Sequence, residues 1–452
     1  MRLISTTRRS LRRLLPLLFL PFLFTGCGPQ QTLQGIFAQP RTPHEAYARQ
    51  LRQAGLDRTA LGRDWLAAAD RALQDSLVVT LPFRETGLFR AEQAFAASYR
   101  YAVRAGEQIS ISLTLEPATA DVRVFVDAFE LDPADPRPRA LASADTLSRS
   151  FSYVAEDDRQ HLLRVQPELL RSGRFTVRIR RGPSLAFPVH GKNDVAVGSF
   201  WGVERDGGAR RHEGIDIFAR RGTPVVAAAA GLITRVGETP RGGRVVWLAD
   251  ATHGRHLYYA HLDQQLVQAG QLVQPGDTLG LVGNTGNARS TPPHLHFGVY
   301  RRGWGAVDPF PFVRRPDTEP AAPRTAPERL GQWVRLTAPR TALRPAPTAP
   351  KTKPATGLPR HTPLLVVGAT ADWLRVQDPS GRLGYVPAKS VATEALRREA
   401  LAGPADLLSH PTAAATPLDT LPAQARVAVL GEWSGYRLVR NAAGQVGWLR
   451  QG

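Results

Sequence analysis

The chain of 452 residues contains a single cysteine, Cys27, and this scarcity excludes two kinds of structure. No disulfide can form within the chain, and no zinc site can be built from cysteine ligands. The apolar stretch near the N-terminus, residues 14–24, is too short to cross a bilayer as a helix. Acidic residues are absent from residues 1–26, which hold five arginines. These first residues therefore differ in character from the rest of the chain.

The chain is strongly basic: its net charge is +19 as a whole and +14 without residues 1–26. Nucleic-acid binding would require the cations to cluster on one face or along one stripe. Arginine is instead scattered through every region of this sequence, so we expect no nucleic-acid partner. A basic surface is still attracted to anionic polymers and to membrane headgroups.

Residues 1–26 have the pattern of a secretory signal peptide. A basic segment, residues 8–13, precedes the apolar residues 14–24, as the n-region precedes the h-region in such signals. The following Phe24-Thr25-Gly26-Cys27 resembles a bacterial lipobox, in which the cysteine becomes the lipidated first residue of the mature protein. That resemblance implies attachment to a membrane through a lipid on Cys27. A stray cysteine in an ordinary signal peptide is the alternative, and both interpretations predict export.

The next residues predict a tether and then two helices. Residues 27–42 are polar, as expected of a tether, and residues 43–76 have helical periodicity. Thr42-Pro43-His44-Glu45 has the features of a helix start: a threonine cap, proline in the first turn and a glutamate that completes a capping box. A second helix is expected over about 63–76, where Trp65 begins a helical spacing of apolar residues.

Two regions with strand periodicity follow. In residues 77–182 apolar side chains alternate with others in several short runs, for example at Ile109, Ile111 and Leu113, which predicts a β-sandwich. Residues 185–312 combine frequent glycines with short β runs, and tight turns between short strands indicate an antiparallel β-fold.

Within that second region, two pairs of side chains have the spacing of a metal site. His294 and His296 are two residues apart on an expected strand, so both imidazoles share one face. Upstream, Gly214 between His212 and Asp216, together with the β-branched residues that flank Asp216, opposes a helix. A histidine on a loop and an aspartate on a strand can then converge. Zinc accepts imidazole nitrogen and carboxylate oxygen, and three protein ligands with one open position are typical of catalytic zinc.

Four motifs in order carry a resemblance to a known family. They are His212-x-x-x-Asp216, Tyr259-Ala260-His261-Leu262, Gly283-Asn284-Thr285-Gly286 and Pro293-His294-Leu295-His296-Phe297. With these motifs, residues 185–312 resemble the lysostaphin-type (LytM-like) zinc endopeptidases of bacterial cell walls. The resemblance covers under a third of the chain.

The resemblance implies a role for each matched residue. His212, Asp216 and His296 would bind Zn²⁺, and His261 and His294 would remain unligated and catalytic. One of these two histidines would take the proton from a zinc-activated water, and the other would stabilise the oxyanion or protonate the leaving amine. The sequence leaves open which does which. Many relatives carry glutamate after His-x-His-Phe, where this chain has Gly298.

A Pro-rich linker, residues 313–330, leads to an internal repeat. Asp372-Trp373-Leu374-Arg375-Val376 precedes Gly384-Tyr385-Val386, and Gly435-Tyr436-Arg437-Leu438-Val439 precedes Gly447-Trp448-Leu449. This repeat resembles bacterial SH3-like modules, which commonly bind cell-wall peptides, and it defines modules at residues 331–395 and 400–452. Small stabilising barrels without a ligand are the alternative, because a fold does not fix a function.

The whole chain is thus expected to be mainly β: short helices and a β-sandwich, an antiparallel LytM-like peptidase domain, and two small SH3-like barrels. The expected function is zinc-dependent hydrolysis of peptide cross-links or stem peptides in peptidoglycan. A non-catalytic regulator that binds the wall or activates another wall hydrolase is the alternative. The expected location is the cell envelope, lipid-anchored at the periplasmic face of the outer membrane. The sequence does not indicate an oligomeric state.

Overall fold

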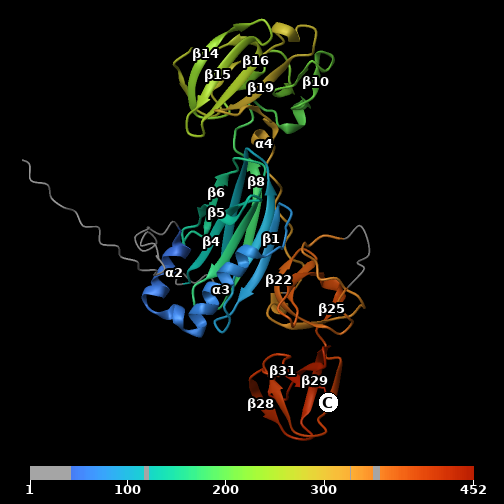
Figure 1. Ribbon diagram of the computed structural model, residues 1–452. Coiled ribbons are helices and arrows are strands. Elements are labelled where there is room, and N and C mark those ends of the chain that lie inside the picture. The colour runs from blue at the N-terminus through green and yellow to red at the C-terminus, as the bar shows by residue number, and fades with distance from the viewer. Residues whose placement is uncertain (1–41, 117–121, 326, 350–356, 452) are drawn as a thin grey trace, which may run out of the picture. The chain divides into compact units, whose positions relative to one another are not determined.

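A computed structural model of the protein describes residues 42–116, 122–325, 327–349 and 357–451 (Figure 1). The expected signal peptide, the lipidation site Cys27 and nearly all of the tether lie outside these residues. Within them, no helix is both long and apolar enough to cross a membrane. The chain is mainly β, as the sequence predicts, and the strands of its sheets pair in antiparallel fashion along open paths rather than closed barrels.

The two expected helices are α2 (Pro43–Gln53) and α3 (Ala60–Gln74). The Thr42 hydroxyl caps α2 by accepting a hydrogen bond from the Glu45 backbone N–H. Helix α3 begins a few residues before the expected position, because Thr59 caps it by accepting from the Gly62 N–H. The indole of Trp65 is buried and donates to the Pro167 carbonyl oxygen at 2.8 Å, which fixes α3 against the sheet below it.

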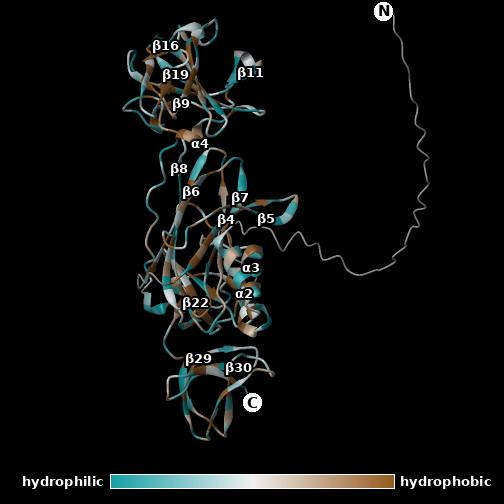
Figure 2. Cartoon of the chain, turned by 90° about the vertical axis from the view of Figure 1, so that its left-hand side faces the viewer, coloured by the Kyte–Doolittle hydropathy of each residue, from teal (hydrophilic) through white to brown (hydrophobic). Residues whose placement is uncertain are grey.

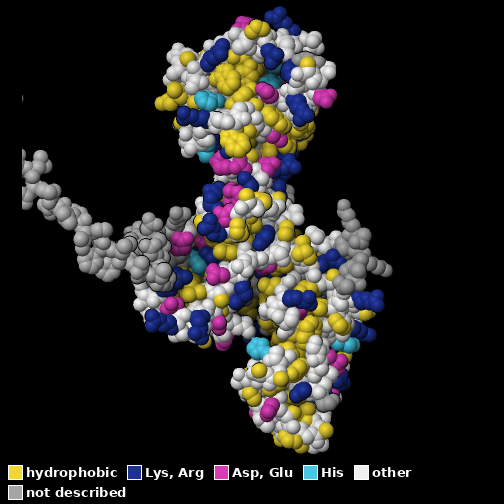
Figure 3. Space-filling view, in the orientation of Figure 1, with side chains coloured by type: hydrophobic (Ala, Val, Ile, Leu, Met, Phe, Trp, Pro, Cys, Tyr) yellow, Lys and Arg dark blue, Asp and Glu magenta, His cyan; other side chains and the backbone are white. Residues whose placement is uncertain are grey.

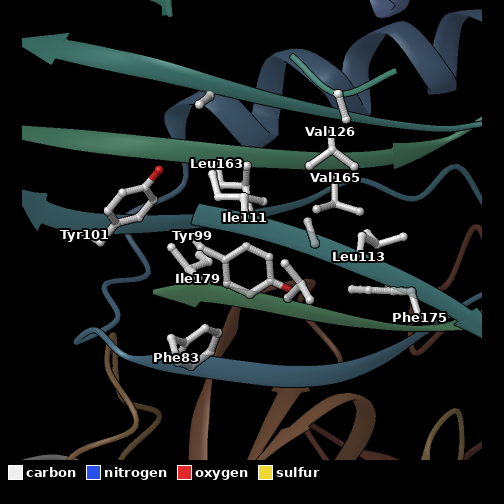
Figure 4. Packing of buried hydrophobic residues seen from close by; sticks show 14 of the residues in the cluster. Phe83, Tyr99, Tyr101, Ile111, Leu113, Val126, Leu163, Val165, Phe175 and Ile179 are labelled. Carbon is white, nitrogen blue, oxygen red and sulfur yellow. The ribbon is translucent and has the colours of Figure 1, made fainter. Parts of the chain in front are cut away.

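That sheet is one of two that enclose a hydrophobic core over residues 79–179. One sheet has the order β2-β7-β4-β5, and the other contains the run β1-β8-β3-β6. Figure 4 shows the inward side chains of both sheets in contact, among them Tyr99, Ile111 and Val165. The strands are β1 (Phe83–Phe89), β2 (Ala97–Val103), β3 (Glu107–Glu116), β4 (Val124–Asp132), β5 (Asp135–Ser143), β6 (Ser150–Val154), β7 (Arg159–Pro167) and β8 (Gly173–Pro183).

A second core, over residues 185–313, surrounds the region that carries the site. Its main sheet has the order β17-β14-β15-β16-β19-β12-β9, and β13, β18 and β20 pair beside this path. Hydrophobic and hydrophilic residues alternate along many of these strands (Figure 2). The strands are β9 (Val197–Ser199), β12 (Ile215–Phe218), β13 (Pro224–Val226), β14 (Gly231–Thr239), β15 (Gly243–Asp250), β16 (Arg255–Gln265), β17 (Leu272–Val273), β18 (Thr278–Val282), β19 (His294–Arg301) and β20 (Gly305–Val307).

Two short strands and a short helix complete this region. Strands β10 (Glu204–Arg205) and β11 (Arg210–Arg211) form a hairpin that leads directly to His212. Helix α4 (Phe310–Val313) ends the region, and Phe312 and Val313 are buried in its core. The segment that follows contains no regular structure between residues 314 and 325, and Glu319 binds both Arg178 and Arg180 of β8.

Two further cores and a smaller buried cluster of Leu430, Leu438 and Trp448 occupy the remaining described residues. The first contains β21 (Trp333–Leu336), β22 (Pro363–Thr370), β23 (Trp373–Gln377), β24 (Leu383–Pro387) and β25 (Val391–Ala392), and β22 also pairs with β1. The second contains β26 (Arg397–Ala400), β27 (Ala405–Leu408), β28 (Pro417–Leu421), β29 (Arg426–Trp433), β30 (Tyr436–Arg440) and β31 (Val446–Arg450). Each copy of the sequence repeat forms an adjacent strand pair, β23–β24 and β30–β31. The likeness of these two units to SH3 modules stays a prediction.

Candidate metal and catalytic site

The pairing of β12 with β19 brings the two halves of the sequence pattern together. Asp216 lies opposite His296, and Ile217 lies opposite Leu295. Directly opposed residues of antiparallel strands share a face, so the aspartate and the histidine lie on one side of the sheet. Ile217 and Leu295 lie on the other side and are completely buried in the core.

Three potential ligand atoms converge at this point. His212 Nε2 is 3.0 Å from Asp216 Oδ1 and 3.0 Å from His296 Nδ1. The distance between His296 Nδ1 and Asp216 Oδ1 is 3.1 Å. These three residues are the group of His, Cys, Asp or Glu side chains that could hold a metal ion among the described residues. The three residues that the sequence predicts as metal ligands therefore lie side by side in the structure.

The other polar atoms of two of these side chains are held by the protein. His212 Nδ1 is 2.9 Å from the Phe200 carbonyl oxygen, so an Nδ1–H donor would leave Nε2 as an acceptor directed at the cluster. Asp216 Oδ2 accepts a hydrogen bond from the Arg205 guanidinium at 2.7 Å. The same guanidinium nitrogen donates to Ser199 Oγ at 2.7 Å. These contacts orient one nitrogen of His212 and one oxygen of Asp216 toward the same point.

Gly214 is required by the close packing of this cluster. A Cβ atom at position 214 would lie 2.6 Å from His296 Cε1 and 2.7 Å from the Phe297 carbonyl oxygen. Both distances are shorter than any normal carbon contact, so a side chain would displace the imidazole or the strand. The glycine between His212 and Asp216 therefore makes room for the third member of the cluster.

Burial and hydrogen bonding set the charges of the cluster. Burial by itself would raise the pKa of Asp216, but the hydrogen bonds with His212 and His296 outweigh it and hold that pKa below its ordinary value. Burial lowers the pKa of His296, against the opposing effect of Asp216. An ionised carboxylate and a neutral imidazole are the forms of these groups that bind a divalent cation.

His261 and His294 lie beside the cluster without belonging to it. Their ring centroids are 5.1 Å apart, and the ring of His261 is 5.9 Å from that of His296. His261 Nδ1 lies 2.9 Å from the Thr285 carbonyl oxygen, and His294 Nδ1 lies 2.8 Å from the Pro292 carbonyl oxygen. In each case a donating Nδ1–H leaves Nε2 as the acceptor nitrogen of the ring. Nε2 of His294 lies 4.0 Å from Asp216 Oδ1.

His261 also has an unusual backbone. Its φ angle is +63°, in the left-handed region, and it lies where the pairing of β16 is irregular. A residue other than glycine is held in this conformation only where its surroundings compensate for the strain, a situation that recurs at functional sites. Burial, followed by the neighbouring His294 and His296, lowers the pKa of His261 to about 4.

The remaining histidines of this region lie apart from the cluster. His253 Nδ1 is 2.9 Å from a carboxylate oxygen of Asp250, and His190 and His256 are exposed. Glu213 precedes β12 rather than lying on a strand, and its carboxylate is not a member of the ligand group. Among the described residues, none of these side chains supplies an atom to the group formed by His212, Asp216 and His296.

Sequence reasoning missed Arg205 and the backbone acceptors. Arg205 belongs to a two-residue strand whose only sequence signal is a short basic hairpin before His212. The carbonyl groups of Phe200, Pro292 and Thr285 carry no side-chain signal at all, although Thr285 lies within a matched motif. Their role depends on which backbone groups the fold brings next to each imidazole.

The donor set suits zinc. Two imidazole nitrogens and one carboxylate oxygen are ligand types that zinc accepts, and three protein ligands leave a further position open. Histidine and carboxylate ligands in metal sites are usually held by a second protein group. Here the Phe200 carbonyl holds His212, and the Arg205 guanidinium holds Asp216. The residues present therefore fit a zinc ion.

Comparisons with known proteins place this site in a family. Residues 210–309 match the model of Peptidase family M23. The L-Ala–D-Glu endopeptidase of Bacillus subtilis is 38% identical over 141 residues, which are 28% of this chain and 43% of that protein. Lysostaphin of Staphylococcus simulans is 36% identical over 107 residues, 23% of this chain and 21% of that protein. The chain thus spans less than half the length of these curated relatives.

A solved structure of the catalytic domain of lysostaphin from Staphylococcus simulans is 34% identical to this chain. The match covers 25% of this chain and 89% of that domain, with a TM-score of 0.24. The family model and the curated relatives show that this chain contains an M23 (LytM-like) peptidase domain. The predicted family of this part of the chain is confirmed, and the domain is called the peptidase domain below.

Proposed function

We propose that the protein is a zinc-dependent endopeptidase that hydrolyses peptide cross-links or stem peptides of bacterial peptidoglycan. One observation carries this proposal: the ligand atoms of His212, Asp216 and His296 meet within an M23 domain, beside two histidines whose Nδ1 atoms face backbone carbonyl oxygens. The relatives named above, among them an L-Ala–D-Glu endopeptidase, support the substrate class.

In this proposal His212, Asp216 and His296 hold the zinc ion. When bound, the ion supplies a Lewis acid that polarises the scissile carbonyl and lowers the pKa of water. Arg205 keeps the carboxylate of Asp216 in place, and the Phe200 carbonyl keeps His212 in the required tautomer. These contacts preorganise the site before substrate arrives.

His261 and His294 move the protons. One Nε2 takes a proton from the attacking water as the new C–O bond forms. The other donates a hydrogen bond or a proton as the C–N bond breaks and the amine leaves. Because both rings are anchored through Nδ1 to backbone carbonyls, both can perform either step, and the assignment is left to experiment.

The envelope location is part of the proposal. The lipobox-like sequence at Cys27 supports a lipid anchor in an exported protein, and the charge of +14 that remains without residues 1–26 favours contact with anionic surfaces. The two C-terminal modules would raise the local concentration of the enzyme at the wall by tethering.

The test uses the full chain and purified cross-linked peptidoglycan. New amino groups should appear with the wild-type protein, disappear with a chelator and return when zinc is added. His296→Ala should abolish the release, and His190→Ala, which changes an exposed histidine of the same region, should not. Zinc content is measured in parallel. A zinc-loaded protein that releases no amines would contradict the proposal and favour the non-catalytic regulator of another wall hydrolase.

A further inference from the structure

An aromatic row crosses the sheet next to the candidate site. Trp247 of β15 lies opposite Tyr258 of β16, which lies opposite Gly298 of β19. Opposed residues share a face, and so do residues two apart on one strand. The face that carries His296 therefore also carries Trp247, Tyr258 and Tyr300.

These three aromatic side chains form one surface, which we call the aromatic shelf. Ring centroids of Trp247 and Tyr258 are 4.5 Å apart, and those of Trp247 and Tyr300 are 5.1 Å apart. Tyr258 also meets His296 edge to face at 5.8 Å. All three rings of the shelf are partly exposed. The shelf therefore begins at a candidate zinc ligand and extends away from it across the sheet.

Gly298 gives the shelf its shape. A Cβ atom at this position would lie 3.0 Å from Tyr300 Cε2 and 3.3 Å from the Glu213 carbonyl oxygen. A larger residue would therefore push the Tyr300 ring away. Because position 298 has no side chain, the Tyr300 ring can lie close to it and contact Trp247.

The edges of the shelf are polar. Arg235 of β14 lies opposite Trp247, and the Tyr258 hydroxyl hydrogen-bonds with the Thr239 side chain. Hydrophobic side chains gather on the surface over β15 and β16 with basic side chains nearby (Figures 1 and 3). Flat, partly exposed rings with hydroxyl and guanidinium groups at their edges suit a ligand that is itself apolar on its face and polar around its rim. An apolar peptide side chain would be held better by an enclosed pocket.

We propose that the aromatic shelf binds a sugar ring of the glycan strand while the attached peptide lies at the zinc site. A pyranose has C–H groups on its face, which pack on aromatic rings, and hydroxyl and amide groups at its rim. Tyr300 is four residues beyond His296, roughly 13 Å along the strand, a distance that a few extended peptide residues span. The shelf would then make the enzyme prefer peptides that are still attached to glycan. This inference rests on the proposed function and adds the part of the substrate that is recognised.

The first experiment compares two substrates. One is a muropeptide that carries its disaccharide, and the other is the same peptide freed of sugar by an amidase. The wild-type chain should cleave the glycan-bearing form with the higher kcat/KM. Trp247→Ala should lower the ratio of the two kcat/KM values about tenfold, the size expected when aromatic contacts are lost. Trp247→Leu, which keeps an apolar side chain, should lower it as well.

Trp304→Ala is the matched control, because Trp304 is a 70% exposed tryptophan outside the shelf, and it should leave the ratio as in the wild type. A Trp247→Ala protein with an unchanged ratio would overturn the inference. A variant that loses only its activity on free peptide would overturn it too, and would identify a peptide side chain as the occupant. Thermal unfolding of each variant confirms that the fold is intact.

A binding experiment separates this inference from the proposed function. The full-length protein is titrated with N-acetylglucosamine oligomers, and binding is measured by the change in tryptophan fluorescence. This measurement needs no catalysis. Binding that Trp247→Ala weakens about tenfold, and that Trp304→Ala leaves intact, supports the shelf even if no peptide is cleaved. Normal hydrolysis without any sugar binding or substrate preference would refute the shelf and leave the peptidase proposal standing.

Discussion

Arg205 Nη2 lies 2.7 Å from Asp216 Oδ2, while the other oxygen of the same carboxylate faces His212 and His296. The carboxylate of Asp216 therefore contacts a cationic side chain through one oxygen and two imidazoles through the other. The guanidinium comes from the hairpin that immediately precedes His212. The orientation of a candidate metal ligand thus depends on a residue that makes no contact with the ion site itself.

Arg205→Ala should weaken zinc binding by about tenfold to a hundredfold, the usual cost of losing an outer contact to a metal ligand. The measurement is a competition titration with a chromophoric chelator, which needs no substrate. Arg220→Ala, an exposed arginine of the same domain, is the control. Equal zinc affinity in Arg205→Ala and the wild type would show that Asp216 is held without the guanidinium.

Gly214→Ala should damage the cluster through steric overlap alone. The added methyl group would meet His296 Cε1 at 2.6 Å, so the imidazole or β19 must shift. We expect a loss of about 1–3 kcal/mol in the free energy of unfolding together with weaker zinc binding. Gly237→Ala places a methyl group whose nearest neighbour would be Arg235 Nε at 3.8 Å, and it should retain wild-type metal affinity. Full zinc affinity in Gly214→Ala would contradict the packing described for His296.

Replacing His261 or His294 by alanine, one at a time, should lower the rate of hydrolysis without affecting zinc binding. Each variant should retain zinc, because neither residue is in the ligand group, and each should lose roughly 10²–10⁴-fold in kcat. The dependence of kcat/KM on pH then assigns the roles. The variant without the general base should lose the acidic limb of the profile, and the variant without the general acid should lose the alkaline limb. Loss of zinc in either variant would make that histidine a ligand instead.

His44 should make the folded protein sensitive to acid. It is 5% exposed, stacks on Trp65 with ring centroids 4.8 Å apart, and hydrogen-bonds with Gln166. Burial, with a smaller contribution from Arg164, lowers its pKa to about 3 in the folded protein. The unfolded chain, with a pKa near 6.5, therefore binds more protons between pH 6.5 and 3. Stability is fully present above that range and falls as the pH decreases through it.

His44→Phe keeps an aromatic ring in this position and removes the titration. The slope of unfolding free energy against pH between pH 6 and 4 should be smaller in this variant by up to about 1.4 kcal/mol per pH unit. Urea unfolding at several pH values measures the slope. His410→Phe, at an exposed histidine, should keep the wild-type slope. Identical slopes in His44→Phe and the wild type would show that His44 is not the source of the acid sensitivity.

Much of the local structure could be read from the sequence because it depends on neighbouring residues. The Thr42 cap and Pro43 place the start of α2 correctly. Helix α3 begins a few residues before the expected start at about residue 63, because the Thr59 cap and not the first large apolar side chain sets its first turn. The alternation in residues 294–297 likewise placed His294 and His296 on one face, and β19 has that geometry.

What the sequence determined by itself was the set of candidate residues, which lie in short motifs of residue type and spacing: His212, Asp216, His261, His294 and His296. Only the tertiary structure decided how these residues are held and what surrounds them. The Arg205 guanidinium, the carbonyl groups of Phe200 and Thr285, and the aromatic shelf become neighbours of the site only when the chain folds. Pairing between distant strands follows from the packing of the whole core, and backbone carbonyls are the same in every residue, so no local pattern reveals them.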